Sequence, residues 1–151
     1  MNQLWKVGHV LYLRGGVLRC LSRIIELLWF IVGGHAISVK ASIGENTVFY
    51  HRGVGCVVHD KTVIGSGCHI FQNVTLGSKW SNGVCEGGAP IIGNNVMIGA
   101  GACVLGEVTV GDNSVIGANS VIIEDIPCNC TVVGVPGKIV KNLKVCAEDK
   151  R

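Results

Sequence analysis

The residues of this chain best suited to chemistry are three histidines in its first half, His51, His59 and His69. An imidazole ring changes charge near neutral pH, so a histidine can act as a general base, and it can also bind a metal ion. His51 differs from the other two because it begins a glycine-rich segment, residues 51–55 with the sequence HRGVG, where a side chain can leave regular structure. This setting would allow the His51 side chain to act as such a base; the alternative is a histidine exposed at a turn.

The eight cysteines are the other reactive side chains of the chain. They are Cys20, Cys56, Cys68, Cys85, Cys103, Cys128, Cys130 and Cys146. No pair of CxxC motifs occurs at zinc-ribbon spacing, and residues 128–130, CNC, are alone a weak metal signal. Without a secretory signal, we expect buried, reduced thiols and a cytoplasmic protein. The longest apolar run, residues 27–32, is far too short to cross a membrane.

The composition indicates one domain of short strands and tight turns. Of 151 residues, 22 are glycine, and aromatic residues make up only 5%. With 48% hydrophobic and 15% charged residues, the chain is not a disordered polar one. The net charge of +3 is too small to argue for a nucleic-acid partner, and we expect none.

Residues 1–34 form an N-terminal segment with a helical pattern. Its apolar residues recur every three, four or seven positions, and Gly15-Gly16 predicts a break between two helices. Four basic residues precede the first acidic one, Glu26. We expect a helical cap on the domain or on a neighbouring subunit, because the apolar stripe needs a core partner. The alternative is a basic amphipathic segment that lies on an anionic membrane surface.

After residue 34 large aliphatic residues recur every six positions. They are Val58, Ile64, Ile70 and Leu76, then Ile92, Ile98, Val104, Val110, Ile116 and Ile122. A small or β-branched residue usually follows four positions later, and a glycine often follows directly. A period of six matches neither a helix nor a lone strand, and it predicts a solenoid whose aliphatic residues stack inward while Gly or Asn permits the turns. Ile43 and Phe49 look like an earlier part of this series, displaced by a three-residue insertion.

Such hexapeptide repeats resemble those of left-handed parallel β-helices, with three hexads in each triangular coil. The left hand is implied by this resemblance, because general topology rules favour right-handed crossovers. The predicted fold class is an all-β solenoid, a left-handed parallel β-helix with an N-terminal α-helical segment. We expect the β-helix domain to span residues 35–140 and a C-terminal tail to span residues 141–151.

A loop interrupts the repeats between Leu76 and Ile92. The next hexad was due at position 82, so ten extra residues project from the solenoid within Ser78–Pro90. A solenoid gains nothing structural from such an excursion, and long loops in compact domains tend to be functional.

Four segments in this order resemble the serine acetyltransferase branch of the hexapeptide-repeat acyltransferases. They are residues 49–55 (FYHRGVG), 73–77 (NVTLG), 96–102 (VMIGAGA) and 134–140 (GVPGKIV), and the resemblance covers residues 37–140. It implies that His51 is the general base that deprotonates an acceptor hydroxyl, which attacks acetyl-CoA directly without a covalent acyl-enzyme. It also implies a homotrimer in which His51 of one chain faces the loop of another.

The same resemblance assigns the donor site. The backbone amides of Gly77 and Ser78 are candidates to stabilise the oxyanion. The positions that match the coenzyme A site are Gly77, Ala100, Ala118, Pro136 and Lys138. Small residues let the pantetheine arm approach the backbone, and the Lys138 ammonium can meet a phosphate. Ala100 and Ala118 can alternatively be mere filling of the repeat.

Departures from the family concern the acceptor. Ala36 stands where serine acetyltransferases carry an Asp, Tyr50 where an acidic residue usually precedes the catalytic His, and Gly88-Ala89 where an Arg-His pair is usual. Without these counter-charges a zwitterion would bind poorly. We therefore expect O-acetylation of a saccharide in surface-polysaccharide biosynthesis. The alternatives are serine O-acetylation in cysteine biosynthesis and a non-enzymatic solenoid.

The partner that orients His51 is open in the sequence. Glu45 and Asp60 are the candidate carboxylates. A zinc site is the other possibility, because some left-handed β-helix proteins are carbonic anhydrases with three histidine ligands. Their two nearby ligands are five residues apart, whereas the intervals between the three histidines here are eight and ten. We expect no metal.

Overall fold

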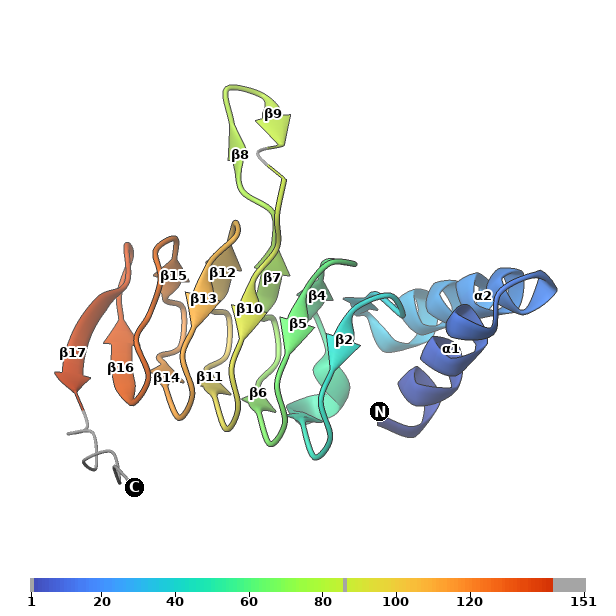
Figure 1. The fold of residues 1–151 in the computed structure, drawn as a ribbon, viewed down its shortest axis with the longest axis horizontal. Helices are drawn as coiled ribbons and strands as arrows, with labels where there is room; N and C mark the ends of the chain where they lie inside the picture. Colours follow the sequence, from blue (N-terminus) through green and yellow to red (C-terminus); the bar gives the residue numbers. More distant parts are fainter. Residues whose placement is uncertain (1, 86, 143–151) are drawn as a thin grey trace, which may run out of the picture.

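A computed structural model describes residues 2–85 and 87–142. It begins with two antiparallel helices, α1 (Asn2–Arg14) and α2 (Val17–Gly33), which extend from one end of a solenoid (Figure 1). The break predicted at Gly15-Gly16 is present, with φ of 71° and 57°. Gly34 ends α2 in a left-handed conformation, and its N–H donates to the Phe30 carbonyl at 3.1 Å. No helix within these residues is long and apolar enough to span a bilayer.

The solenoid consists of three sheets of short parallel strands. The first sheet contains β1 (Ala36–Ile37), β4 (Val57–Val58), β7 (Thr75–Gly77), β12 (Cys103–Leu105) and β15 (Val121–Ile122). The second contains β2 (Ser42–Ile43), β5 (Val63–Ile64), β10 (Ile91–Ile92) and β13 (Thr109–Val110). The third contains β3 (Val48–Phe49), β6 (His69–Ile70), β11 (Met97–Ile98), β14 (Val115–Ile116) and β16 (Cys130–Val133), and β17 (Lys138–Asn142) pairs antiparallel with β16.

The predicted aliphatic ladder forms the core. All ten aliphatic residues of the series are at most 3% exposed. Each stacks on its counterpart one coil away, as Ile64 does on Ile92 and Ile98 on Ile116. Phe49 pairs with Ile70 and Ile43 with Ile64, so both belong to the ladder, as expected. Parallel in-register stacking buries the aliphatic side chains continuously along the axis, which is the main source of solenoid stability.

The glycines that follow the aliphatic residues have a different role from the predicted one. We expected them to permit turn conformations, but Gly65, Gly99 and Gly111 do not have positive φ. A Cβ at Gly65 would lie 2.5 Å from the Gly93 carbonyl oxygen, so these positions are glycine because adjacent coils approach too closely. The left-handed turn residues come two positions later, as at Gly67 (φ 68°) and Asn95 (φ 54°).

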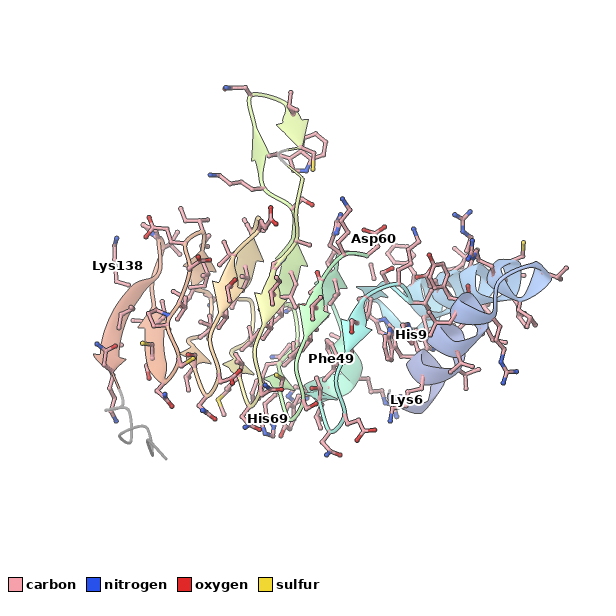
Figure 2. The ribbon with its side chains drawn as sticks, in the orientation of Figure 1. Lys6, His9, Phe49, Asp60, His69 and Lys138 are labelled. Carbon is pink, nitrogen blue, oxygen red and sulfur yellow. The ribbon has the colours of Figure 1, made fainter. Side chains whose placement is uncertain are left out.

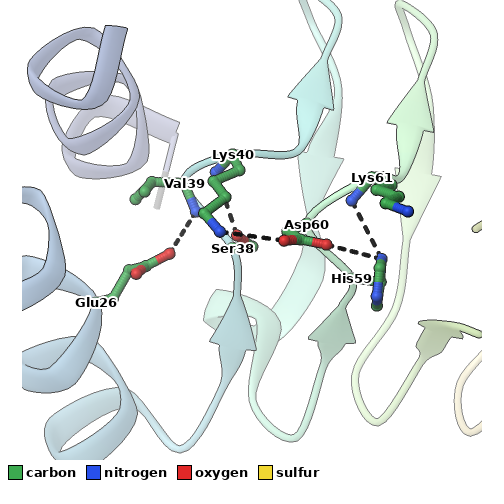
Figure 3. Close-up of polar contacts among 7 residues, drawn as sticks. All are labelled: Glu26, Ser38, Val39, Lys40, His59, Asp60 and Lys61. Carbon is green, nitrogen blue, oxygen red and sulfur yellow. Dashed lines mark hydrogen bonds and ion pairs between the residues drawn. The ribbon is translucent and has the colours of Figure 1, made fainter. Parts of the chain in front are cut away.

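A small polar network joins the helices to the first coils (Figure 3). Glu26 of α2 accepts a hydrogen bond from the Val39 N–H at 2.6 Å. Lys40 donates to Asp60 at 3.2 Å, and this hydrogen bond lowers the pKa of the Asp60 carboxyl. His59 lies 3.1 Å from the other Asp60 oxygen. These contacts fix the helical segment to the solenoid beside β1 and β4.

The last residues of the predicted C-terminal tail lie outside the described part of the chain. Residues 141 and 142 end β17, whereas residues 143–151, with Cys146, are not described.

Candidate active site

His51 projects from an irregular turn between β3 and β4. The turn is the 3-10 segment η1 (Tyr50–Gly53), and it contains the predicted three-residue insertion. His51 (φ 51°), Arg52 (φ 59°) and Gly53 (φ 70°) are left-handed in succession. Each non-glycine residue in this conformation costs about 1–2 kcal/mol, so the surrounding contacts must impose it. Both the His51 and Arg52 side chains are exposed, as a group that receives a substrate must be.

Tyr50 anchors this turn to the following coil. Its ring stacks on Phe71, with centroids 4.6 Å apart and planes 11° apart. Its hydroxyl lies 3.0 Å from Nδ1 of His69 on β6, a residue at the lower edge of the solenoid in Figure 2. In the sequence Tyr50 stands out only as the residue at a position where the family usually has an acidic side chain. Its contacts could not be predicted because both partners come from the next coil.

His51 belongs to the same edge of the solenoid as Ala100 and Ala118, two of the predicted coenzyme A positions. We call this the site edge, where the chain passes from the third sheet to the first; it contains Val54, Gln72, Ala100 and Ala118, one residue in each coil. Backbone hydrogen bonds of 2.9–3.0 Å link it: Asn73 N–H to the Val54 carbonyl, Gly101 N–H to Gln72, and Asn119 N–H to Ala100. His51 therefore lies three residues before the first member of a row of backbone that runs along the solenoid.

The row ends at a pocket near the C-terminal end of the solenoid. Pro136 and Lys138 line this pocket together with Glu124, Asp125 and neighbouring apolar residues. Ile116 pairs with Val132, sixteen residues later, so the position one coil after Ala118 is Gly134, two residues before Pro136. The Gly137 N–H donates to the Val121 carbonyl at 2.8 Å. Lys138 is exposed and lies at the end farthest from the helices (Figure 2).

The inserted loop leaves the opposite edge of the first sheet. Gly77 ends β7, and the Ser78 hydroxyl donates to the Gly88 carbonyl at 3.0 Å, which closes the base of the loop. Strands β8 (Trp80–Ser81) and β9 (Val84–Cys85) form a hairpin that pairs with no other sheet and projects from the solenoid (Figure 1). Gly88 has φ 70°, and a Cβ there would lie 2.6 Å from Cβ of Glu107. Close packing therefore requires glycine where the family carries a charged residue.

The candidate carboxylate Asp60 has other partners. It contacts Lys40 and His59. His69 contacts Tyr50, so two of the three histidines are held in separate contacts. Within residues 2–85 and 87–142, no three His, Cys, Asp or Glu side chains are grouped so that they could hold a metal ion.

The cysteines in the described ranges are all free thiols. Burial raises the pKa of Cys56 and of Cys68, so both remain protonated, small apolar side chains near neutral pH. The Cys56 thiol contacts the Phe71 carbonyl oxygen at 3.2 Å. Neither thiol is suited to act as a nucleophile.

The fold is a repeat solenoid with an exposed histidine and a projecting loop, and comparisons with known proteins give the class to which it is similar. Residues 89–124 match the family model of the bacterial transferase hexapeptide, six repeats. Together with the homologues below, this match supports the acyltransferase family of hexapeptide-repeat proteins for this chain.

Within that family the similar proteins are serine acetyltransferases. The enzyme of Synechococcus elongatus is 38% identical over 135 residues, which are 89% of this chain and 53% of that protein. The crystal structure of the Neisseria gonorrhoeae enzyme superposes with a TM-score of 0.84 at 36% identity, over 93% of this chain and 52% of that one. The Brucella abortus enzyme in complex with coenzyme A gives 0.84 at 30% identity, over 93% and 54%. The chain thus spans about half the length of these relatives.

These comparisons confirm the β-helix and correct the predicted acceptor. The neighbours share the left-handed β-helix with N-terminal helices. The expectation of a saccharide acceptor is wrong, because the relatives and the structural neighbours are serine acetyltransferases. The saccharide acceptor was inferred from the absence of charged side chains at Ala36, Tyr50, Gly88 and Ala89. That absence is a weaker indicator of the acceptor than the similarity over the whole chain.

Proposed function

We propose that this chain transfers an acetyl group from acetyl-CoA to the hydroxyl of serine. One observation carries the proposal: His51 is held outward, in an imposed backbone conformation, at the start of the site edge. The similarity to serine acetyltransferases, one of them bound to coenzyme A, supports both the donor and the acceptor. The exposed Arg52 guanidinium beside His51 is the kind of group that binds a carboxylate.

In the proposed reaction the His51 imidazole takes the proton of the serine hydroxyl. The hydroxyl oxygen then bonds to the thioester carbonyl carbon, and the resulting oxyanion accepts hydrogen bonds from the Gly77 and Ser78 amides of a neighbouring chain, whose loop faces His51 in the proposed trimer. When the carbon–sulfur bond breaks, the leaving thiolate takes the proton back from the imidazolium. The thioester is already activated, so a base, positioning and oxyanion donors suffice, and no acyl-enzyme forms.

Coenzyme A would bind along the site edge. Ala100 and Ala118 offer little side chain to obstruct a pantetheine arm, while Pro136 and Lys138 line the terminal pocket where a phosphate would meet the ammonium. A homotrimer is part of the proposal, because β8 and β9 pair with no other strand of residues 2–85 and 87–142 and project from the solenoid, where a second chain can contact them.

The test is release of free thiol from acetyl-CoA as serine is added. We expect turnover with serine by the natural chain and at least a hundred-fold loss of kcat in His51→Gln, because general base catalysis contributes about 10²–10⁴-fold. Binding of coenzyme A, measured by calorimetry, should remain the same in that variant. Absence of turnover with serine in the natural chain would contradict the acceptor, and retained turnover in His51→Gln would contradict the base.

A further inference from the structure

The outward face of α2 is apolar and has no partner within the described residues. Its large side chains are 44–86% exposed. They are Val17, Leu21, Ile24, Leu27, Leu28, Ile31 and Val32. At 3.6 residues per turn these positions share one arc of about 140° that contains no charged residue. A stripe of that width on a surface helix normally faces a protein core.

The opposite face of α2 already makes the contacts with the solenoid. Ser22 is fully buried, and Trp29 packs against the core. Glu26 accepts the Val39 N–H (Figure 3). The helix is therefore fixed by one side, and its apolar arc is directed away from the molecule that it caps. The predicted role as a cap therefore explains the apolar residues of α2 that face the solenoid, but not those of the exposed arc.

The helical hairpin of α1 and α2 carries a net positive charge equal to that of the whole chain. Residues 2–34 contain four basic side chains, Lys6, Arg14, Arg19 and Arg23, and one acidic side chain, Glu26. Their balance is +3, equal to the formal net charge of the entire chain, so the remaining residues are neutral in sum. Arg23 lies about 40° beyond the Leu27 edge of the apolar arc at about 100° per residue, whereas Arg19 lies near the Glu26 face, over the Tyr12 ring at 5.0 Å.

We propose that this hairpin lies on an anionic lipid surface, with the apolar arc of α2 in the acyl boundary and the basic side chains of the hairpin at the headgroups. An exposed apolar face on a basic hairpin, bordered by Arg23, is the pattern of interfacial helices, and about 25 Å of α2 would lie in the membrane plane. A second copy on the same face would bring two hairpins of equal positive charge together, whereas anionic lipid neutralises them. This proposal is independent of the proposed catalytic function.

The experiment is flotation of the full chain with vesicles of phosphatidylcholine and with vesicles of equimolar phosphatidylcholine and phosphatidylglycerol. We expect association with the anionic vesicles only. The double variant Ile24→Glu/Leu28→Glu should lower the partition coefficient at least about tenfold, because the free energy gained by burying these two apolar side chains in the membrane is lost. Arg19→Gln/Arg23→Gln should lower it about fivefold per arginine on anionic vesicles.

Val84→Glu is the matched control, because Val84 is 65% exposed on the projecting hairpin and should not affect flotation. Circular dichroism confirms that each variant remains folded, and the arginine variant tests the proposal even if the glutamate variant does not fold. Equal association with both vesicle types would overturn it. So would a lack of association accompanied by self-association that Ile24→Glu/Leu28→Glu abolishes, which would assign the face to a second copy.

Discussion

His51 reaches outward because two successive non-glycine residues, His51 and Arg52, hold left-handed backbone angles. Such a turn costs about 1–2 kcal/mol for each residue, comparable with the roughly 0.5–1.5 kcal/mol that one aromatic stack contributes. The Tyr50–Phe71 stack is thus large enough to shift the balance between this turn and a relaxed one. Tyr50 is a positioning residue, since it acts on the reaction through the backbone of His51.

Replacement of Tyr50 tests this role. Tyr50→Leu removes the stack and should lower kcat by about tenfold or more, since small misplacements of a catalytic group cost up to about 10²-fold. Tyr50→Phe retains the ring on Phe71 and should keep most of the rate. KM for acetyl-CoA should change little in either variant, because the site edge lies beyond the turn. Equal kcat in the leucine and phenylalanine variants would rule out the stack as the cause.

Ala36 offers a second test at the residue scale. Its backbone N–H donates to the Cys56 carbonyl at 2.8 Å, which places it in the coil adjoining the His51 turn. A carboxylate here would restore the negative charge that serine acetyltransferases carry at this position. That charge would attract the ammonium group of serine. Ala36→Asp should lower KM for serine several-fold, measured by initial rates at saturating acetyl-CoA. Ala36→Asn, similar in size but uncharged, is the control and should not change KM.

His51 was a candidate in the sequence through its glycine-rich segment and the resemblance to acyltransferases, and the three residues too many between Phe49 and Val58 predicted an excursion there. It did not predict the left-handed angles or the contacts of Tyr50. Those depend on Phe71 and His69, which occupy outward positions of the next coil, where the repeat places no constraint on residue type. The signal that the sequence offered was the pair of rings, His69 and Phe71, one position on either side of the ladder residue Ile70.

At the scale of elements, the ladder was predictable because every sixth residue must be large and apolar to fill a triangular coil. The role of the glycines was not, because the pattern cannot separate a left-handed turn from a close approach. Gly93 illustrates the difference: a Cβ there would lie 2.3 Å from the Asp112 carboxylate. The need for glycine at position 93 follows only from the short distance between adjacent coils, which the sequence does not show.

The junction of α2 and β1 makes stability depend on pH. His35 is 6% exposed, lies edge-on to Trp29 at 5.5 Å, and its Nδ1 has no hydrogen-bond partner within the described chain. Desolvation lowers the pKa of His35 in the folded protein. The unfolded chain therefore binds this proton at higher pH, and the free energy of unfolding should decrease as pH falls below about 6.5.

Urea denaturation at a series of pH values measures this dependence. His35→Gln should flatten the decrease below pH 6.5, whereas His59→Gln, a more exposed histidine in the neighbouring coil, should retain it. An unchanged slope in His35→Gln would assign the acid sensitivity to another group.

At the scale of the whole molecule, the proposed site would take parts from two chains. Within the described residues the β8–β9 hairpin pairs with no other sheet, and it leaves the first sheet at the edge opposite the His51 turn. In a cyclic trimer the hairpin of one chain can cover the site edge of the next. Light scattering should then give about three times the 15.9 kDa mass of the chain.

Shared sites predict complementation between two inactive variants. One variant carries His51→Gln, and the other has residues 80–85 replaced by a short glycine linker. If each site takes His51 from one chain and the hairpin from its neighbour, every mixed trimer has one complete site of three and should recover about one third of the natural activity. Differently tagged chains, purified in sequence, isolate the mixed trimers for the thiol-release assay. Sites built within single chains would give no recovery in those trimers, and an active hairpin variant would exclude the hairpin from the site.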